Sequence, residues 1–514
     1  MKKYIIGIDI GGTNTDAVII DENQNIISSC KTSTTDQIAD GFIKAINILL
    51  SKAKIKPNEI SAVNVGTTHA TNALLQKKDL LTVGVIRIAG QNPFLPPAYG
   101  WPADTRSIIY KDQVTINGGF ECDGKEITKF NTLEISKAVD TILSTGAQSI
   151  AIIGVFSPIY NHQEIIVEKI IKKIAGEKFP VTLSSSIGGA GFIERENSTI
   201  LNCALAECIK KGFSSLEESL KSLKIQAPLF MTQNNGTIIT IEKAINYPIL
   251  TISAGPTNSF IGGTKLAKLS NAIVVDIGGT STDVGIVING FARRTLNSSY
   301  IDGIKLNFAM PDVLSVALGG GSHINFDKNN NCQIGPESCA RKILKDAVSF
   351  GGSILTLTDI AILEGFIKID GANPKLTNLP EDKIKIILNI LRKKIINLIN
   401  IITGPQKFPV ILVGGGADLL PKDFIQNSIR PKYFNVANAY GAAMSEISGN
   451  VDTVASLTNR DEILEKLKIE AIENAIANGA DKKTVRIVNM QIIPYHYVPD
   501  NLARVIITSS GRRT

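Results

Sequence analysis

The chain has 514 residues, 44% of them hydrophobic and 20% charged, so it can bury more than one core and is expected to form two or three domains. Its net charge of +7 comes from 54 basic and 47 acidic residues spread along the chain, which argues against a nucleic-acid-binding face. No apolar run reaches the roughly 18 residues of a membrane helix, and Lys2 and Lys3 lead straight into a strand pattern, so we expect no membrane segment, no signal peptide and a cytoplasmic location. Six scattered cysteines without a CxxC pair predict reduced, mostly buried thiols.

The first part of the chain alternates strand and helix patterns. Residues 4–10 and 17–20 are apolar and flank the turn GGTNT, which predicts two antiparallel strands. The next predicted elements are a helix at 41–53, a strand, loop and helix at 62–78, strands at 82–88 and 149–155, and a helix at 161–175 capped by Asn161.

The second part repeats this alternation. The predicted elements are one or two helices within 184–223, a strand and turn at 227–239, a second hairpin at 272–289, a buried strand and glycine loop at 409–421, helices at 438–449 and 460–478, and a strand at 503–508. We therefore predict an α/β fold with two similar lobes, residues 1–180 and 181–449. Residues 450–514 are expected to form a C-terminal extension of helix and strand.

One segment is written twice. "YIIGIDIGGTNTDAVIID" at 4–21 returns as "AIVVDIGGTSTDVGIVIN" at 272–289. Paired glycines let backbone N–H groups turn toward an anion, and the Thr and Ser hydroxyls add donors for phosphate oxygens. Asp9 and Asp276 end buried strands, where a carboxylate needs donors or a cation, and a Mg²⁺ ion carried by phosphate would supply one. A single copy would also suit an ordinary hairpin with a capping aspartate, but two copies favour opposed lobes that clamp one polyphosphate.

Two further glycine loops accompany the hairpins. Gly414, Gly415, Gly416 and Asp418 follow the strand "VILV", where a purine and its ribose would lie against the backbone, although a plain turn has the same pattern. The loop at 310–324, with Ser322 and His323, is expected to border the nucleotide or the substrate. No GxxxxGK[ST] loop, GxGxxG turn or GxSxG elbow is present in the sequence.

The paired hairpins resemble those of the actin, hexokinase and Hsp70 superfamily, which has a two-lobed, ribonuclease-H-like fold. Longer stretches resemble the hydantoinase/oxoprolinase family, in particular its A-type chains. The segments that carry this resemblance are "IGIDIGGTNTDAV", "VGTTHATNALL", "IGGAGFIERENSTILNCAL", "TQNNGTI", "SAGPTNS", "VDIGGTSTDVGIV", "MPDVLSVALGGGSHI", "FGGSILTLTDIA" and "ILVGGGADLLP".

The resemblance implies ATP-dependent opening of a cyclic amide, such as a hydantoin or 5-oxoproline, through phosphorylation of the amide oxygen. The alternative, ranked second, is the nucleotide-using subunit of a carboxylase, since relatives use a chain of this type in ATP-dependent carboxylation of ketones. Larger members continue into a second catalytic half, so an oligomeric assembly with a separate hydantoinase B-like subunit is expected. A nucleotide-switched chaperone is a third reading, but it would need a long substrate-binding domain, and only about 65 residues follow residue 449.

The resemblance also assigns roles to residues. Asp9 and Asp276 are expected to hold Mg²⁺, or Mn²⁺, through water, and Asp283 is expected to be functional, while the role of Asp16 is open. The phosphate cradle is Gly11, Gly12, Thr13, Asn14, Gly278, Gly279, Thr280 and Ser281, and the adenosine loop is Gly414, Gly415, Gly416 and Asp418.

The expected substrate side is the segment "GTTHATN" at 66–72. Thr67, Thr68 and Asn72 match the family text, whereas relatives carry a histidine where this chain has Val65. His69 is therefore either a substrate residue or a structural one, with the structural role favoured. The proline-rich loop at 90–106, which contains Trp101, departs from the family text and is a substrate loop, a partner contact or a rigid surface loop.

Overall fold

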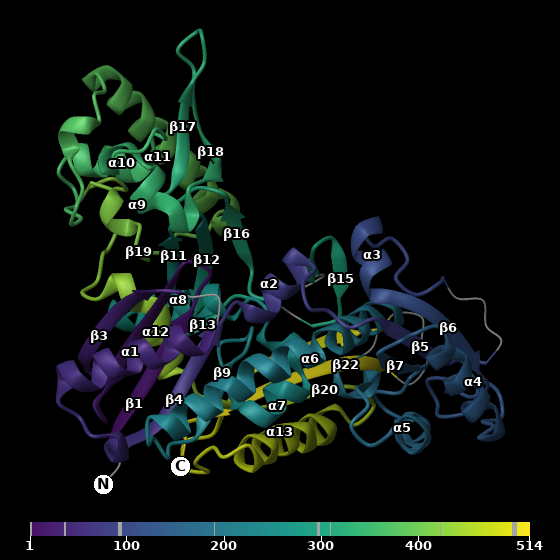
Figure 1. Cartoon of the computed structure of the whole chain (residues 1–514). Helices are drawn as coiled ribbons and strands as arrows, with labels where there is room; N and C mark the ends of the chain where they lie inside the picture. Colours follow the sequence, from purple (N-terminus) through teal and green to yellow (C-terminus); the bar gives the residue numbers. More distant parts are fainter. Residues whose placement is uncertain are drawn as a thin grey trace.

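The computed structural model describes residues 3–34, 38–90, 95–189, 191–295, 299–308, 310–421, 423–495 and 501–513. Within these ranges the largest sheet has nine strands (Figure 1). In sheet order they are β21 (Arg486–Pro494), β22 (Leu502–Gly511), β20 (Ile447–Ser456), β10 (Ile238–Thr240), β9 (Leu229–Thr232), β4 (Ile60–Thr67), β1 (Tyr4–Ile10), β2 (Asn14–Ile20) and β3 (Ile26–Ser33).

The strand β1 organises this sheet. Its sequence YIIGIDI is almost wholly apolar, as expected for a strand covered on both faces, and five of its seven residues are buried. β1 pairs antiparallel with β2, which brings Asp9 opposite Asp16, and parallel with β4, which brings Asp9 opposite Gly66. The glycine turn at residue 11 therefore follows the C-terminal end of β1, beside the C-terminal end of β4.

A second sheet repeats the arrangement. β11 (Ala272–Ile277) pairs antiparallel with β12 (Thr282–Ile288) and parallel with β19 (Val410–Val413), just as β1 pairs with β2 and β4. β12 is also flanked by β13 (Phe291–Ala292) and β16 (Val313–Val316). The molecule thus has a two-lobed α/β architecture, with one glycine-turn hairpin in each lobe.

The strands of a third sheet, β5–β8, come between β4 and β9 in the sequence. It is parallel, with the order β6 (Tyr110–Ile116), β5 (Val83–Ile88), β7 (Ser149–Gly154) and β8 (Val181–Leu183). In Figure 1 this sheet lies on the far side of the first lobe from β1–β3, whereas the second sheet and its helices stand above the first lobe. Two small hairpins, β14 (Ser299–Ile301) with β15 (Ile304–Leu306) and β17 (Ser322–Phe326) with β18 (Cys332–Ser338), complete the described strands.

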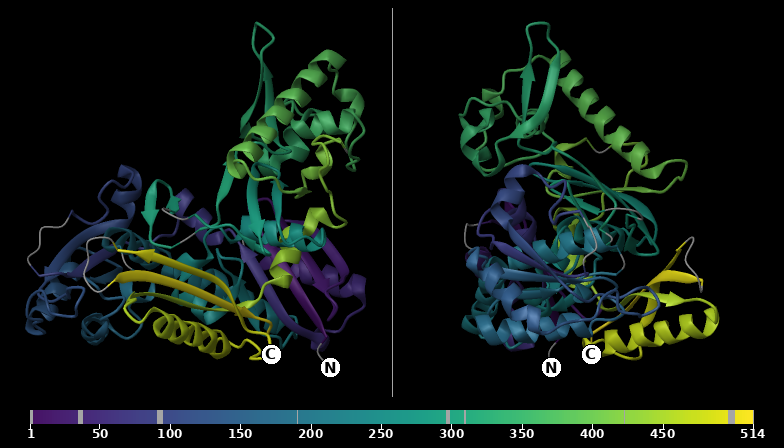
Figure 2. Two further views of the ribbon diagram at one scale, coloured as in Figure 1. Left: turned by 180° about the vertical axis from the view of Figure 1, so that it is seen from behind. Right: turned by 90° about the vertical axis from the view of Figure 1, so that its right-hand side faces the viewer.

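Helices cover the three sheets. In chain order they are α1 (Ile38–Ala53), α2 (His69–Gln76), α3 (Ala103–Ile109), α4 (Leu133–Ser144), α5 (His162–Ala175), α6 (Phe192–Ser222), α7 (Ile241–Asn246), α8 (Ala254–Leu266), α9 (Ile343–Asp346), α10 (Leu357–Leu363), α11 (Glu381–Thr403), α12 (Ala437–Met444) and α13 (Arg460–Ala477). Helix α11 buries Ile387, Leu391 and Ile395 at helical spacing against the second lobe, and it forms the long outer helix in Figure 2. No helix in the described ranges has both the length and the apolar character needed to cross a membrane.

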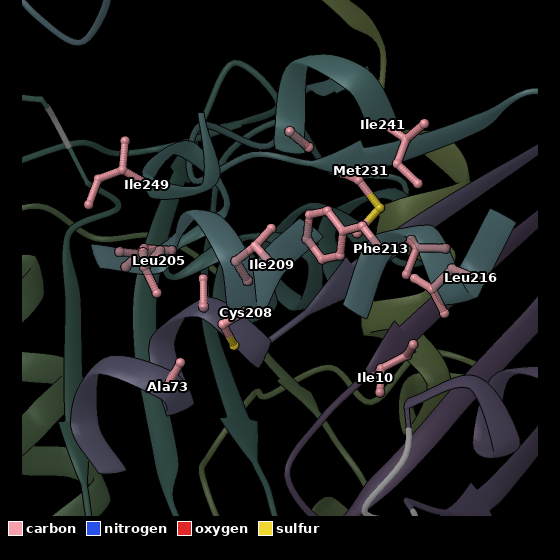
Figure 3. Packing of buried hydrophobic residues seen from close by; sticks show 14 of the residues in the cluster. Ile10, Ala73, Leu205, Cys208, Ile209, Phe213, Leu216, Met231, Ile241 and Ile249 are labelled. Atoms are coloured by element: carbon pink, nitrogen blue, oxygen red, sulfur yellow. The ribbon is translucent and has the colours of Figure 1, made fainter. Parts of the chain in front are cut away.

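Helix α6 is the centre of the first core. Its residues Leu205, Ile209 and Phe213 point into a cluster that also contains Met231 of β9 and Ile10 of β1 (Figure 3). The stretch from Arg195 to Leu205 is buried around its whole circumference, so this helix lies inside the molecule and not on its surface.

The helices α8 and α12 connect the lobes and cross at very close range. A Cβ on Gly441 would overlap the carbonyl oxygen of Asn258, so only glycine permits this approach. The crossing places Asn438 of α12 and Asn258 of α8 beside Asp9, and Ser259 of α8 beside Asp276.

Several predicted elements differ from the structure. Of the one or two helices predicted within 184–223, the structure has one, Phe192–Ser222. The helix predicted at 438–449 spans Ala437–Met444, and β20 begins at Ile447. Asn161 occupies the N-cap of α5, but its side chain makes no capping hydrogen bond. Strands β20 and β22 add to the sheet that the N-terminal strands begin, while the predicted domain boundaries at 180 and 449 stay a prediction.

Candidate active site

The two glycine turns have the same backbone geometry. The N–H of Gly11 donates to the carbonyl of Asn14 at 3.0 Å, and the N–H of Gly278 donates to the carbonyl of Ser281 at 2.8 Å. A side chain built on Gly12 or on Gly279 would meet no atom within 4 Å. Both turns therefore present an open backbone face, as an anion-binding loop requires.

Asp9 and Asp16 share amide partners at the first turn. Asp9 is 5% exposed and accepts hydrogen bonds from the Nδ2 groups of Asn438 at 3.0 Å and Asn258 at 3.4 Å. The Asn438 amide also donates to Asp16 at 2.9 Å. Burial raises the pKa of Asp9 to about 6, and the charges of Asp16 and Asp276 add to this rise.

Asp276 and Asp283 stand at the second turn with fewer polar partners. Burial raises the pKa of Asp276, although a hydrogen bond from Ser259 and the charge of Lys31 oppose this. Burial likewise raises the pKa of Asp283 to about 6, while the Ser315 hydroxyl donates to its carboxylate. Among the described residues, one lysine pairs with Asp16, and its charge also acts on Asp276.

That cation is Lys31, which no motif of the sequence indicates. Its Nζ lies 2.6 Å from Asp16, and a Cβ on Gly415 of the other lobe would lie 3.3 Å from it. A second cation crosses in the opposite direction, since Nε of Arg341 donates to the carbonyl of Gly12 at 2.7 Å. Each lobe thus extends one basic side chain to the phosphate turn or glycine loop of the other.

The residues at the turns suit a hydrated divalent cation. Four aspartates could not face a polyphosphate without compensating positive charge. The Oδ1 atom of Asn258 is buried beside Asp9 and has no hydrogen-bond partner, so it offers one more oxygen. Among the described residues, no group of three or more His, Cys, Asp or Glu side chains is placed to hold a metal ion by itself. Mg²⁺ or Mn²⁺ would therefore be held by phosphate oxygens and water, with Asp9 and Asp276 binding that water.

The glycine loop after β19 packs directly against the second turn. Gly414 has φ of +88°, and a Cβ there would overlap the carboxylate of Asp276. The N–H of Gly416 donates to the carbonyl of Ile277 at 2.7 Å, while Gly415 is exposed. Asp418 lies 3.7 Å from Arg430. The predicted adenosine loop is thus adjacent to the predicted phosphate loop.

The loop at 310–324 lies on the other side of the same turn. The N–H groups of Gly320 and Gly321 donate to the carbonyls of Gly278 and Gly279 at 3.1 and 2.8 Å. Ser322 is buried and accepts a hydrogen bond from the Gly319 N–H. His323 instead pairs with Glu337 on β18, so it belongs to the β17–β18 hairpin.

Two family models match this chain. Residues 5–175 match the family described as the hydantoinase/oxoprolinase N-terminal region, and residues 195–402 match the family described as hydantoinase/oxoprolinase. The chain belongs to the hydantoinase/oxoprolinase family.

Three relatives of this hydantoinase/oxoprolinase chain are each about 25% identical to it over the aligned residues. It is 25% identical to the uncharacterized protein MJ0964 of Methanocaldococcus jannaschii, over 96% of this chain and 80% of that protein. It is 24% identical to the acetophenone carboxylase gamma subunit of Aromatoleum aromaticum, over 71% of this chain and 53% of the other. It is 25% identical to the caprolactamase alpha subunit of Pseudomonas jessenii, over 72% and 56%. The match spans about half the length of these two enzyme subunits.

Two solved structures share the fold over nearly the whole chain. The ATP-dependent caprolactamase from Pseudomonas jessenii superimposes with a TM-score of 0.77 at 19% identity, covering 99% of this chain and 88% of that one. The nucleotide-free acetone carboxylase superimposes with a TM-score of 0.73 at 17% identity and the same coverages.

In this family member, part of the predicted substrate segment lies beside Asp9. Thr67 is buried at the end of β4, Asn72 donates to the hydroxyl of Thr68 at 3.1 Å, and a Cβ on Gly66 would reach the carboxylate of Asp9. The His69 ring instead contacts α6, with Nε2 lying 3.5 Å from Sγ of Cys208, and burial lowers its pKa.

The tryptophan of the proline-rich loop has a structural role. Trp101 is buried in the first core and donates from Nε1 to Asn197 at 2.9 Å. Residues 91–94 of this loop lie outside the described residues. The six cysteines are unpaired as thiols, and four of them are buried.

Proposed function

We propose that this chain is the nucleotide-using subunit of an enzyme that opens a cyclic amide at the expense of ATP. The observation that carries the proposal is the meeting of two open glycine turns with four aspartates and with Lys31, which pairs with Asp16 and acts on Asp276 of the other lobe. Such a pair of turns suits a polyphosphate with its cation. Membership of the hydantoinase/oxoprolinase family supports the choice of substrate class.

The chemical task is to make an amide carbonyl carbon susceptible to nucleophilic attack by water. An amide carbon is a poor electrophile, and transfer of the γ-phosphoryl group to the amide oxygen makes that oxygen a leaving group. The backbone N–H groups of both turns would hold the phosphate oxygens, and Lys31 would offset charge at the cleft. A bound divalent cation would neutralise charge on the phosphates and on the moving phosphoryl group.

The cyclic amide would bind at the end of β4. Thr67 and Thr68 lie there, next to the strand end that carries Asp9. Hydroxyl and amide groups at this position can orient a carbonyl oxygen toward the γ-phosphate. A separate subunit would complete hydrolysis, in line with the subunit status of the relatives.

The test is calorimetric titration of the purified chain with ADP and with a non-hydrolysable ATP analogue, each with and without Mg²⁺. We expect metal-dependent binding that Asp276→Asn weakens at least about 100-fold, because the water-mediated anchor of the cation is lost. Asp327→Asn is the matched control, since this aspartate of the same lobe only closes an exposed turn between β17 and β18. Equal binding by the two variants would refute the proposed role of Asp276.

A carboxylase subunit is the second candidate, favoured by the similarity to the acetophenone carboxylase gamma subunit. The two functions differ in the fate of labelled bicarbonate when the chain is assayed with a partner subunit. Incorporation of ¹³C into product would support carboxylation, whereas ring opening without incorporation would support hydrolysis.

A further inference from the structure

A cavity of about 800 Å³ lies between the second lobe and the C-terminal strands. The second lobe contributes Ile288 at the end of β12, Phe291 of β13 and the following Arg294, while β21 contributes Val488 and Asn489. The cavity thus lies where two sheets that are distant in the sequence meet. A cavity of this volume can hold a small organic ligand.

Arg294 lines this cavity without a partner. It is partly buried, and its guanidinium makes no hydrogen bond or ion pair with any described residue. Burial lowers the pKa of Arg294 to about 10, and no acidic group opposes this effect. Withdrawing a guanidinium from water is costly unless acceptors replace the water. The five N–H donors of Arg294 are therefore open to a ligand.

The preceding arginine shows the contrast. Arg293 lines the same cavity, but its Nε and Nη2 atoms lie 2.9 and 2.8 Å from Asp312, and Nη2 also donates to the Ile402 carbonyl at 2.6 Å. Asp312 is the one acidic residue among the described residues of the lining, and Arg293 compensates its charge. The lining therefore retains the positive charge of Arg294.

The β21 side of the cavity supplies an amide whose nitrogen is unpaired. Asn489 lines the cavity, and its buried Nδ2 atom has no hydrogen-bond partner in the part of the chain that the structure describes. The pairing of β21 with β22 shifts register between Ile487 and Asn489, and a β-bulge of this kind re-aims a side chain. An acceptor bound in the cavity would satisfy this donor after the amide turns about its Cβ–Cγ bond.

From these contacts we propose that the cavity binds a small molecule through an oxyanion, a phosphate or a carboxylate group, that pairs with Arg294. The planar guanidinium presents paired N–H donors that match two oxygens of such a group. The amides of Asn489 and Gln491 would bind further polar atoms of the ligand, and Phe291 and Val488 would contact an apolar part.

This site is separate from the glycine turns. β12 begins at Thr282 beside the second turn and ends at Ile288 in the cavity wall, and a strand rises about 3.3 Å per residue, so the two sites lie about 20 Å apart. The inference therefore does not rest on the proposed nucleotide chemistry.

The experiment is labelling of the full chain with phenylglyoxal, a reagent for arginine, with the rate read at Arg294 by mass spectrometry. Inorganic phosphate, acetate and chloride are compared at constant ionic strength. We expect phosphate or acetate to halve the rate at a concentration below about 10 mM, whereas chloride should need at least about tenfold more. Arg392, which is exposed on α11, is the internal control and should label at one rate in all three salts.

The salts also distinguish the two sources of the oxyanion. Protection by phosphate alone would support a phosphoryl ligand, and protection by acetate alone would support a carboxylate ligand. Protection by both would show that Arg294 recognises the shared oxyanion. Each of these results supports the site.

A matched pair of substitutions places the anion in the cavity. Gln491→Glu adds a counter-charge to the wall and should raise the half-protecting concentration at least about fivefold. Gln491→Met removes the amide without adding charge and should change it less than about threefold. Urea unfolding checks that both variants are folded. Asp276→Asn should be protected like the wild type, so failure of the nucleotide proposal is distinguishable from failure of this one.

Four results would contradict the proposal. Equal labelling of Arg294 in all three salts at about 100 mM, roughly tenfold above the expected half-protecting concentration, overturns it. Failure of Arg294 to label in chloride, where Arg392 labels, would show that its guanidinium is not open to a ligand. Equal protection of Arg392 would assign the effect to the reagent. Equal half-protecting concentrations in the two Gln491 variants would place the anion outside the cavity.

Discussion

The two hairpins have nearly the same sequence but different neighbours. In the first, β3 pairs with β2 so that Lys31 stands opposite Asp16. In the second, β16 pairs with β12 so that Ser315 stands opposite Asp283. The cross-strand partner is thus a cation in one lobe and a hydroxyl in the other.

The difference shows that a duplicated motif need not have duplicated electrostatics. Lys31 compensates Asp16 at 2.6 Å and also acts on Asp276 of the other lobe, whereas burial raises the pKa of Asp283 to about 6. The first turn carries its own counter-charge, and the second depends on charge from outside itself. A phosphate-bound cation would therefore matter most at the second turn.

The largest expected effect on stability follows from removing the shared cation. Lys31→Met should lower the free energy of unfolding by about 2–3 kcal/mol at pH 7.5 without nucleotide, because Asp16 is left buried beside Asp9 and Asp276. The measurement is urea unfolding followed by circular dichroism. Lys44→Met, an exposed change on α1, should cost less than about 0.5 kcal/mol. Equal losses in the two variants would show that the cluster does not need Lys31.

A smaller effect, of opposite sign, is expected from Asp9→Asn. The folded pKa of Asp9 is about 6 against 3.8 for a free aspartate, so ionised Asp9 opposes folding. This penalty is absent below about pH 4, grows as the pH rises from about 4 to 6, and is constant at higher pH. The free energy of unfolding of Asp9→Asn should therefore exceed that of the wild type by about 1–2 kcal/mol at pH 8, without nucleotide or divalent cation.

The control is the same pair of proteins at pH 4, where the difference should vanish. A difference that does not change with pH would mean that the substitution acts through packing and not through charge. Titration of the unfolding midpoint between pH 4 and pH 8 separates these outcomes.

A substitution at Ser315 can give the second hairpin the same type of cross-strand partner as the first. Ser315→Lys puts a cation opposite Asp283, as Lys31 stands opposite Asp16, and should stabilise the chain by about 0.5–1 kcal/mol at pH 7.5. Because the lysine lowers a pKa that is now about 6, the gain should fall as the pH is lowered toward 5. Ser315→Met matches the length without the charge and should show no such pH dependence. A gain equal in both variants would assign the effect to apolar contact.

The hairpins are predictable because their signals are local. Glycine pairs, hydroxyls and alternating apolar residues define a strand, a turn and a strand within 18 residues, and the pairing of Asp9 with Asp16 follows from that register. The glycine loop at 414–416 is recognisable for the same reason. The functional roles of these residues stay predictions until they are tested.

The partners of the aspartates cannot be found in this way. Lys31 lies on β3, which no pattern in the sequence predicts, and Asn258 and Asn438 lie on α8 and α12, far from Asp9 in the chain. Their contacts depend on the close crossing of two helices, which no local pattern encodes. The one available signal is a buried asparagine within the apolar stretch of α8.

The C-terminal strands show a similar limit. The sequence predicts a C-terminal extension of helix and strand after residue 449, but no local pattern shows that β20 pairs with β10 at Ile447 and Ile238 and so continues the first sheet. Strand pairing over such a sequence distance is set by the tertiary fold. The outermost of these strands, β21, also lines the cavity that contains Arg294.

The smallest expected effect concerns His69, which lies two residues from Thr67 but faces a different part of the molecule. Its ring contacts Cys208 of α6, and burial lowers its pKa, so it is neutral at pH 7 and does not add charge to the turns. His69→Gln should therefore change kcat/KM for nucleotide hydrolysis by less than about twofold, whereas Thr68→Ala, one residue away, should lower it by at least about tenfold. Steady-state assays of both variants across pH 6–8 make the comparison. A large loss in His69→Gln that follows a titration near pH 6.5 would instead place this histidine in the reaction, because only a side chain that exchanges a proton there would impose that profile.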